Sequence, residues 1–121
     1  MGSADGAIGV IGGGQLARML SEAAALRGID VLVQTASEAD CAVAASSRLV
    51  QALPTDQEAT RELARDCSGI TFENEWVSVD ALMPLERQGV TFVPSLASLV
   101  PLVNKLSQRR LLDDLSIPSP R

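Results

Sequence analysis

The sequence lacks histidine and tyrosine, and it contains only one tryptophan and two phenylalanines among 121 residues. Without histidine, the chain has neither the usual proton-transfer group near neutral pH nor the commonest metal ligand. Its two cysteines, Cys41 and Cys67, lie 26 positions apart with no second pair. This spacing indicates neither a zinc site nor a disulfide, so we expect two buried, reduced thiols and no metal site.

The chain also lacks an excess of positive charge and any long apolar run. Ten basic residues face 15 acidic ones, which gives a net charge of −5 and a pI near 4.6. That balance argues against binding to a nucleic-acid backbone. No apolar run approaches the ~20 residues that cross a bilayer, and residues 1–6 do not resemble a signal peptide. We therefore expect a cytoplasmic domain without nucleic-acid or membrane partners.

What the sequence does contain is an alternation of strand-like apolar runs with segments of helical period. Strands are expected at 7–11, 29–34, 48–53, 70–73 and 90–93. Helices are expected after 14, from 55 to 66, from 78 to 88 and after 95, with a short one within 37–47. Connections of this length between strands predict right-handed crossovers. The predicted fold class is α/β, with an open, mainly parallel five-stranded sheet and helices on both faces.

Local signals predict how these helices begin, end and pack. Thr55 and Glu58 have the spacing of a capping box, and Ser78 is a second candidate cap. Pro84 removes a helical hydrogen bond, so we expect a bend or an early end there. The apolar residues of the first helix recur at i, i+3, i+4, i+7 and i+8, which predicts that they form its buried face: Leu16, Met19, Leu20, Ala23 and Ala24.

A glycine-rich turn, Gly12-x-Gly14-x-x-Ala17, connects the first strand to the first helix. In this context free backbone N–H groups and the helix dipole favour an anion or a polar group. A site of the NAD type also needs an acid at the end of the second strand, but that strand ends at Gln34-Thr35. Two interpretations stay open: a phosphate or polar sugar of another ligand, or glycines that only permit close packing.

The segment Thr71-Phe72-Glu73-Asn74-Glu75-Trp76 follows the fourth strand. Ligands of open α/β sheets bind at the carboxyl ends of strands, so Glu73 and Glu75 are expected near the glycine turn. Carboxylates there suit ribose hydroxyls or an amine. A solvated acidic loop is the alternative.

Three motifs in register resemble one family. Gly12 to Met19 is similar to the GGGQLGRM opening of 5-(carboxyamino)imidazole ribonucleotide synthetases, which are ATP-grasp enzymes of purine biosynthesis. The stretch 72–75 resembles their Phe-Glu-x-Glu segment. The residues Pro94-Ser95, 104–106 and 115–120 resemble their PS…DRL…LGIPTP pattern. Departures are Ala17 for glycine, Asn104-Lys105 for Asp-Arg and Ser116 for glycine.

The resemblance implies a Rossmann-like pre-ATP-grasp domain and a set of ligand contacts. Members use ATP and Mg²⁺ to convert bicarbonate to carboxyphosphate and then carboxylate 5-aminoimidazole ribonucleotide. By analogy, the ribonucleotide would contact Glu73, Glu75 and the loop Gly13, Gly14, Gln15 and Leu16. Lys105 would contact ATP, and a solvated helix charge is its alternative role. No catalytic residue is assigned to this chain.

The resemblance also predicts the domain organisation. Residues 1–6 are expected to be a disordered end, 7–115 the N-terminal substrate-binding domain, and 116–121 the start of a linker to an absent ATP-grasp domain. Alone, the chain should be inactive and bind no cofactor tightly; bicarbonate and ATP would bind through absent domains, and the full-length family is expected to be homodimeric. The alternatives are the corresponding domain of formate-dependent glycinamide ribonucleotide transformylase, an NAD(P)-binding domain of an oxidoreductase, and a non-enzymatic interaction module.

Overall fold

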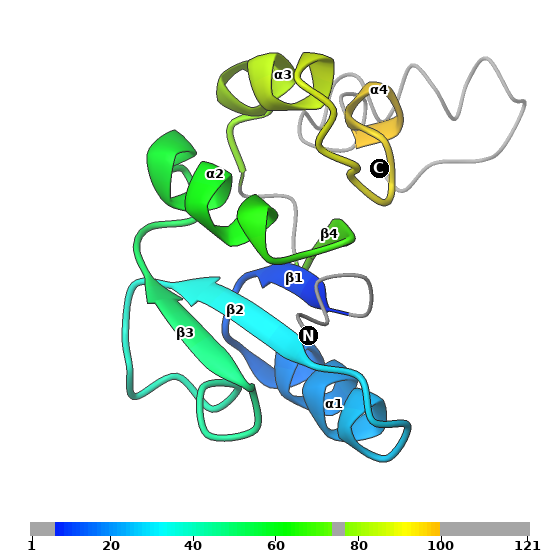
Figure 1. The fold of residues 1–121 in the computed structure, drawn as a ribbon. Coiled ribbons are helices and arrows are strands. Elements are labelled where there is room, and N and C mark those ends of the chain that lie inside the picture. The colour runs from blue at the N-terminus through cyan, green and yellow to red at the C-terminus, as the bar shows by residue number, and fades with distance from the viewer. Residues whose placement is uncertain (1–6, 74–76, 100–121) are drawn as a thin grey trace, which may run out of the picture.

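Four short parallel strands form the centre of the molecule (Figure 1). The computed structural model describes residues 7–73 and 77–99. The strands are β1 (Ile8–Ile11), β2 (Val31–Thr35), β3 (Arg48–Gln51) and β4 (Gly69–Phe72), and their order in the sheet is β3-β2-β1-β4. Every neighbouring pair is parallel, so all four carboxyl ends meet at one edge. The predicted α/β class with a parallel sheet is confirmed.

The prediction of a fifth strand at 90–93 is wrong, because this segment forms only an isolated bridge between Ile70 and Phe92. The Ile70 N–H donates to the Thr91 carbonyl, and the Val93 N–H donates to the Ile70 carbonyl, both at 2.9 Å. No further pairing of this segment with β4 is found among the described residues, and the Val90 N–H donates to the Leu85 carbonyl at the preceding helix end.

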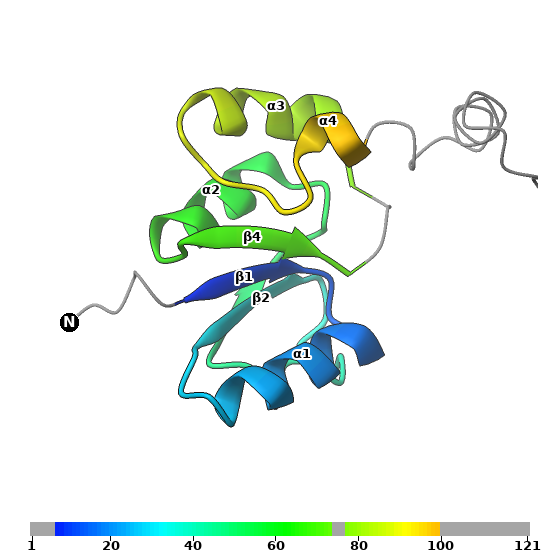
Figure 2. The same cartoon turned by 90° about the vertical axis from the view of Figure 1, so that its right-hand side faces the viewer.

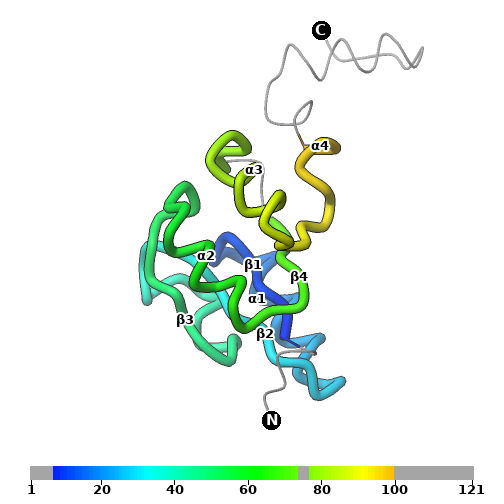
Figure 3. Tube along the Cα trace, turned by 45° about the horizontal axis from the view of Figure 1, so that its top comes forward, coloured from blue at the N-terminus to red at the C-terminus, as the bar shows by residue number. Residues whose placement is uncertain are grey.

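Helices cover both faces of the sheet (Figure 2). The helix α1 (Gln15–Ala25) lies on one face, while α2 (Gln57–Arg65), α3 (Val79–Arg87) and α4 (Leu96–Leu99) lie on the other. Figure 3 shows α3 and α4 next to each other at one end of the domain. The expected short helix within 37–47 is wrong, because successive turns occupy this stretch, such as Val43 N–H to Asp40 carbonyl at 3.0 Å.

The helix ends follow local chemistry, with two corrections. Asp56, not Thr55, caps α2, because its carboxylate accepts from the Ala59 N–H at 3.0 Å. Ser78 caps α3 as predicted and accepts from the Ala81 N–H at 3.4 Å. The helix α3 does not end early at Pro84: it continues to Arg87. Proline removes one hydrogen bond there, and the cap of the helix and its packing on the core offset that loss.

The predicted buried face of α1 is largely wrong. Its buried residues are Ala17, Ser21 and Ala24, which pack with strand valines such as Val10 and Val33. Small side chains let the helix axis approach the sheet closely, which large leucines would prevent. The large apolar residues of α1 lie beside this buried face and are exposed: the exposed fractions are 64% for Leu16, 55% for Met19 and 36% for Leu20.

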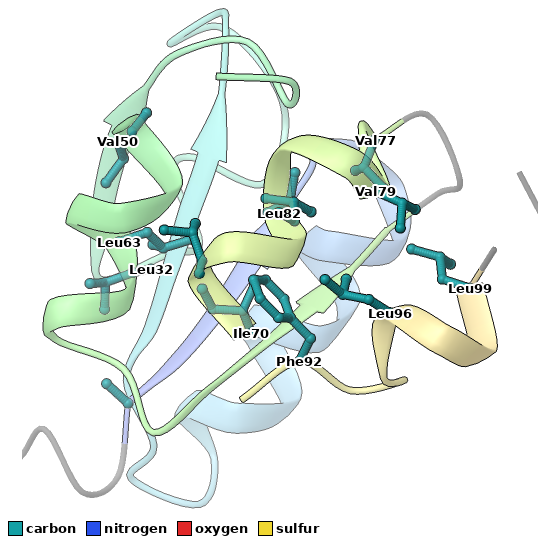
Figure 4. Packing of buried hydrophobic residues seen from close by; sticks show 14 residues of the cluster. Leu32, Val50, Leu63, Ile70, Val77, Val79, Leu82, Phe92, Leu96 and Leu99 are labelled. Atoms are coloured by element: carbon teal, nitrogen blue, oxygen red, sulfur yellow. The ribbon is translucent and has the colours of Figure 1, made fainter. Parts of the chain in front are cut away.

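The larger core lies on the opposite face, between the sheet and the three helices α2, α3 and α4 (Figure 4). Leu63 of α2 and Leu85 of α3 are fully buried there, and Leu82 is 2% exposed. The rings of Phe72 and Phe92 stack at 5.7 Å and close the core at the β4 edge. This core fixes the position of β4, and therefore the position of the residues that follow it.

The two cysteines differ from the prediction that both are buried. Cys41 is exposed, whereas Cys67 is half-buried, and both are free thiols. Burial raises the pKa of the Cys67 thiol to about 11, with a further contribution from the Asp66 carboxylate and a smaller opposing one from Arg48. In the unfolded chain this thiol ionises at lower pH, so between about 9 and 11 the unfolded state binds fewer protons than the native state.

We expect the free energy of unfolding to fall as the pH rises from about 9 to 11, because the Cys67 thiol ionises more readily in the unfolded chain. Below pH 9 the stabilising contribution of the protonated thiol is fully present. Urea unfolding across this range should show the decline, and Cys67→Ser should remove it while Cys41→Ser should not.

In the folded protein at pH 8, iodoacetamide should alkylate Cys41 well before Cys67. Equal alkylation rates for the two thiols would contradict the expected order.

Candidate functional site

The candidate site lies at the carboxyl edge of the sheet, where the glycine loop meets the end of β4. The loop Gly12 to Gly14 leaves β1, and its first N–H donates to the Gln34 carbonyl at 2.9 Å, which extends the β1–β2 pairing by one residue. On the other side of β1, the Glu73 N–H donates to the Ile11 carbonyl at 3.0 Å. Two strand ladders therefore hold the loop and Glu73 next to each other.

The carboxylate of Glu73 caps the N-terminus of α1. Its Oε1 accepts from the Gly14 N–H and its Oε2 accepts from the Ala17 N–H, both at 2.9 Å. The N-cap residue Gly14 has no side chain, and the first turn of α1 contains no acid of its own. A residue 59 positions away thus supplies the negative charge that a helix N-terminus favours.

The three glycines leave room for neighbouring side chains. A Cβ on Gly12 would lie 2.6 Å from the Glu73 Cβ, and one on Gly14 would lie 2.9 Å from the Glu73 Oε1. A Cβ on Gly13 would lie 2.8 Å from three side-chain atoms of Thr35. Gly12 also has a φ of +124°, which side-chain-bearing residues rarely adopt. Close packing is therefore one function of this loop, as the second interpretation of the sequence held.

A second set of contacts joins the loop to the turns after β2. The Thr35 hydroxyl donates to the Asp40 carboxylate, and the Ala42 N–H donates to the Gly13 carbonyl at 3.1 Å. Sequence reasoning missed Thr35 and Asp40. The available signal was the position of Thr35 at the end of β2, where ligand-binding α/β domains place a polar residue.

The end of β2 does not form a site for the ribose of NAD. Gln34 is fully buried: its amide donates to the Leu53 carbonyl at 2.8 Å, and its Oε1 accepts from the Thr60 hydroxyl at 2.8 Å. These bonds tie β2 to α2 and to the loop before it, on the sheet face opposite α1. The position where an NAD site needs an acid is thus occupied by the buried amide of Gln34, as the sequence indicated.

The predicted site residues fall into two groups. The structure brings Gly13, Gly14 and Glu73 together, with Gln15 and Leu16 exposed in the first turn of α1 beside them. Among the described residues, none accepts a hydrogen bond from the N–H groups of Gln15 and Leu16. Glu75 and Lys105 lie outside the described residues, as do Asn74 and Trp76.

A small hollow adjoins the Glu73 carboxylate. It has a volume of about 120 Å³ and is lined by Leu16, Leu20, Thr71 and Glu73 with neighbouring core residues. Pockets that enclose a whole ligand typically measure about 300–1,000 Å³. The hollow therefore suits only part of a small molecule.

In the described part of the chain, no group of three metal-ligating side chains is found, and no helix has the length and apolarity to cross a membrane.

A parallel sheet of order β3-β2-β1-β4, with a glycine loop at its carboxyl edge, defines a Rossmann-like α/β domain. The chain belongs to the family described as "Ribonucleotide synthetase preATP-grasp domain", which matches residues 6–101. The resemblance seen in the sequence motifs is thereby confirmed at the level of the family.

The curated relatives include the N5-carboxyaminoimidazole ribonucleotide synthases of Synechocystis and Synechococcus elongatus. The Synechocystis protein is 48% identical over 113 residues, and the Synechococcus elongatus protein is 49% identical over 114 residues. These matches cover 93% and 94% of this chain and 29% of each relative. The chain thus spans less than a third of the length of these relatives, and it matches their N-terminal portion.

Solved structures of the same kind of enzyme share the fold. The N5-carboxyaminoimidazole ribonucleotide synthetase of Thermotoga maritima aligns with a TM-score of 0.85 at 29% identity, over 95% of this chain and 32% of its own. The synthase of Aspergillus clavatus, in complex with ADP and 5-aminoimidazole ribonucleotide, aligns with a TM-score of 0.82 at 34% identity, over 95% and 31%.

Proposed function

We propose that this chain is the N-terminal substrate-binding domain of an ATP-dependent synthetase that carboxylates 5-aminoimidazole ribonucleotide with bicarbonate in de novo purine biosynthesis. Residues 7–115 would form the domain, and 116–121 would begin the linker to the catalytic part. The main support is the Glu73 carboxylate, which sits on the glycine loop at the carboxyl edge of the sheet. The family match and the names of the relatives favour this substrate over the ligands of other α/β domains.

The charge at the loop favours one orientation of the ribonucleotide. Glu73 already supplies a negative charge to the N-terminus of α1, so a phosphate placed there would meet a like charge within a few ångströms. Hydroxyl and amine groups instead can donate to the free lone pairs of the carboxylate. We infer that Gly13, Gly14, Gln15, Leu16 and Glu73 contact the sugar and base, and that the 5′-phosphate points away from this loop.

Two predicted residues would complete the site from outside the described residues. Glu75 would add a second carboxylate for the sugar or the base. Lys105 would offer a point charge to a phosphate of ATP. The described residues do not themselves form a site for ATP or Mg²⁺. Bicarbonate and ATP would bind through further domains of the parent synthetase.

The isolated chain should have no carboxylation activity and at best weak affinity for the ribonucleotide. Phosphoryl transfer depends on groups that position and neutralise the phosphates, and the hollow beside Glu73 takes only part of a ligand. In the cell we expect the parent protein to be cytoplasmic and homodimeric.

A titration of the ¹⁵N-labelled chain with 5-aminoimidazole ribonucleotide tests the proposal. We expect saturable amide shifts confined to 13–16 and 73–76, because the first range contains the free N–H donors and the second begins with the Glu73 carboxylate. ATP and NADH serve as comparison ligands and should leave those amides unshifted. Glu73→Gln keeps the size of the side chain and should weaken the response, whereas the exposed Glu62→Gln on α2 should not change it.

The other outcomes are distinguishable. A response to NADH alone would point to an oxidoreductase domain, and a response to glycinamide ribonucleotide alone would point to the transformylase. No shift with any ribonucleotide, in a chain that the spectrum shows to be folded, would contradict binding at this loop and favour an interaction module.

A further inference from the structure

One peptide group of the glycine loop is hydrogen-bonded at both of its ends. The Gly13 carbonyl accepts from the Ala42 N–H at 3.1 Å. The N–H of the same peptide group belongs to Gly14 and donates to the Glu73 carboxylate at 2.9 Å. The Cys41 thiol, 3.9 Å from the Gly13 carbonyl, adds a weaker donor. Because a trans peptide group is planar, with its C=O and N–H pointing in opposite directions, these bonds fix its orientation.

The backbone of the loop does not fix this orientation by itself. Glycine lies on both sides of the peptide group, and glycine permits a wide range of backbone angles. A rotation of the Gly13–Gly14 peptide group would break the bond to Ala42 and the bond to Glu73 together. The position of the Glu73 carboxylate therefore depends on contacts that reach the loop from the turns after β2, on the other side of the site.

Asp40 connects these turns to the end of β2. Its carboxylate accepts from the hydroxyl of Thr35, which is only 5% exposed, and hydrogen bonds to an ionised acceptor are stronger than neutral ones. The Thr35 side chain packs against Gly13, where a Cβ would lie 2.8 Å from three of its atoms. Asp40 also lies two residues before the fully buried Ala42, and its carbonyl accepts from the Val43 N–H at 3.0 Å. Both contacts with Gly13 thus come from residues that Asp40 holds in place.

We infer that Asp40 is a positioning residue of the candidate site, which fixes the Gly13–Gly14 peptide group and thereby the carboxylate of Glu73. It acts through Thr35 and Ala42 and does not itself contact a ligand. The effect on the loop is a property of the free chain. The consequence for ribonucleotide affinity rests on the proposed function, so the two are measured separately.

The first test is amide hydrogen exchange in the ¹⁵N-labelled 121-residue chain without ligand. Asp40→Ala should speed exchange of the Gly14 amide on the order of tenfold relative to the Val33 amide, because the bond to Glu73 then opens locally. Val33 is fully buried in β2 and reports opening of the sheet as a whole. The matched control, Glu38→Ala, removes an exposed carboxylate two residues away and should leave the ratio of the two rates unchanged.

Substitutions of Thr35 separate positioning from a general weakening of the turns. Thr35→Val keeps the branched shape but removes the hydroxyl, so it should reproduce the effect of Asp40→Ala, and Thr35→Ser should restore slow exchange of Gly14. This pair decides the matter even if Asp40→Ala does not fold. Exchange of Gly14 and Val33 that rises in equal proportion in Thr35→Val would indicate lost stability alone and would overturn the inference.

The second test is the titration with 5-aminoimidazole ribonucleotide. Asp40→Ala should raise the Kd on the order of tenfold, whereas Asp40→Asn, which keeps an acceptor oxygen for Thr35, should raise it less. If the unsubstituted chain binds no ribonucleotide, the proposed function fails and the exchange of Gly14 alone decides whether Asp40 fixes the loop. If that chain binds and Asp40→Ala binds equally well, Asp40 does not position the site and the inference is wrong.

Discussion

Glu73→Ala is expected to lower the free energy of unfolding by about 2–4 kcal/mol, because two N–H groups of the α1 N-terminus lose a charged acceptor. The bonds are 2.9 Å long and connect residues almost 60 positions apart, so the loss falls on the native state and hardly on the unfolded chain. Urea denaturation followed by far-UV circular dichroism measures the change. A shifted midpoint with an unchanged m-value would indicate lost stability alone.

The matched control is Glu62→Ala, which removes an exposed carboxylate from α2 and should change stability by less than about 0.5 kcal/mol. Glu73→Gln should fall between the two, since an amide oxygen can accept one of the bonds while its NH₂ group faces the second N–H. If Glu73→Ala unfolded at the same urea concentration as the Glu62 control, the carboxylate would not cap α1 in solution.

Gly12→Ala is expected to lower the free energy of unfolding at least as much, by about 3–5 kcal/mol in total. A positive φ costs a side-chain-bearing residue roughly 1–2 kcal/mol, and the new Cβ would meet the Glu73 Cβ at 2.6 Å. Glu73 would have to move, and its two hydrogen bonds to α1 would be lost with it. Thermal and urea unfolding should both register the change, and the amide signals of Gly14 and Ala17 should shift.

Gly89→Ala separates the two costs. Gly89 also has a positive φ, +105°, but a Cβ there meets nothing within 4 Å. Its substitution should therefore cost only the backbone strain of roughly 1–2 kcal/mol. Equal losses for the two variants would show that the contact with Glu73 contributes nothing.

The glycine loop illustrates how a packing role and a binding role can coexist. Gly12 and Gly14 make room for Glu73, and Gly13 makes room for Thr35. The same close packing holds the carboxylate and the exposed first turn of α1 in fixed positions before any ligand arrives. Preorganisation of this kind reduces the cost of ordering a site when it binds.

The sequence by itself determined the α/β class, the parallel order of strands and helices, the Ser78 cap and the meeting of the glycine loop with the end of β4. These features depend on local periodicity, on caps within a few residues and on the rule that parallel strands align their carboxyl ends. The family was also accessible, because three short motifs occur in register along the chain.

Only the tertiary structure decided which residues those elements bury and which partners they meet. The leucines of α1 repeat at helical spacing, yet the sheet accepts Ala17, Ser21 and Ala24, because close approach to β1 and β2 leaves room only for small side chains. Residues 90–93 have strand composition, but they pair with β4 only at the bridge between Ile70 and Phe92, and the Val90 N–H donates to the end of α3 instead. The Glu73 cap on α1 joins residues far apart in the chain, a contact that no local pattern encodes.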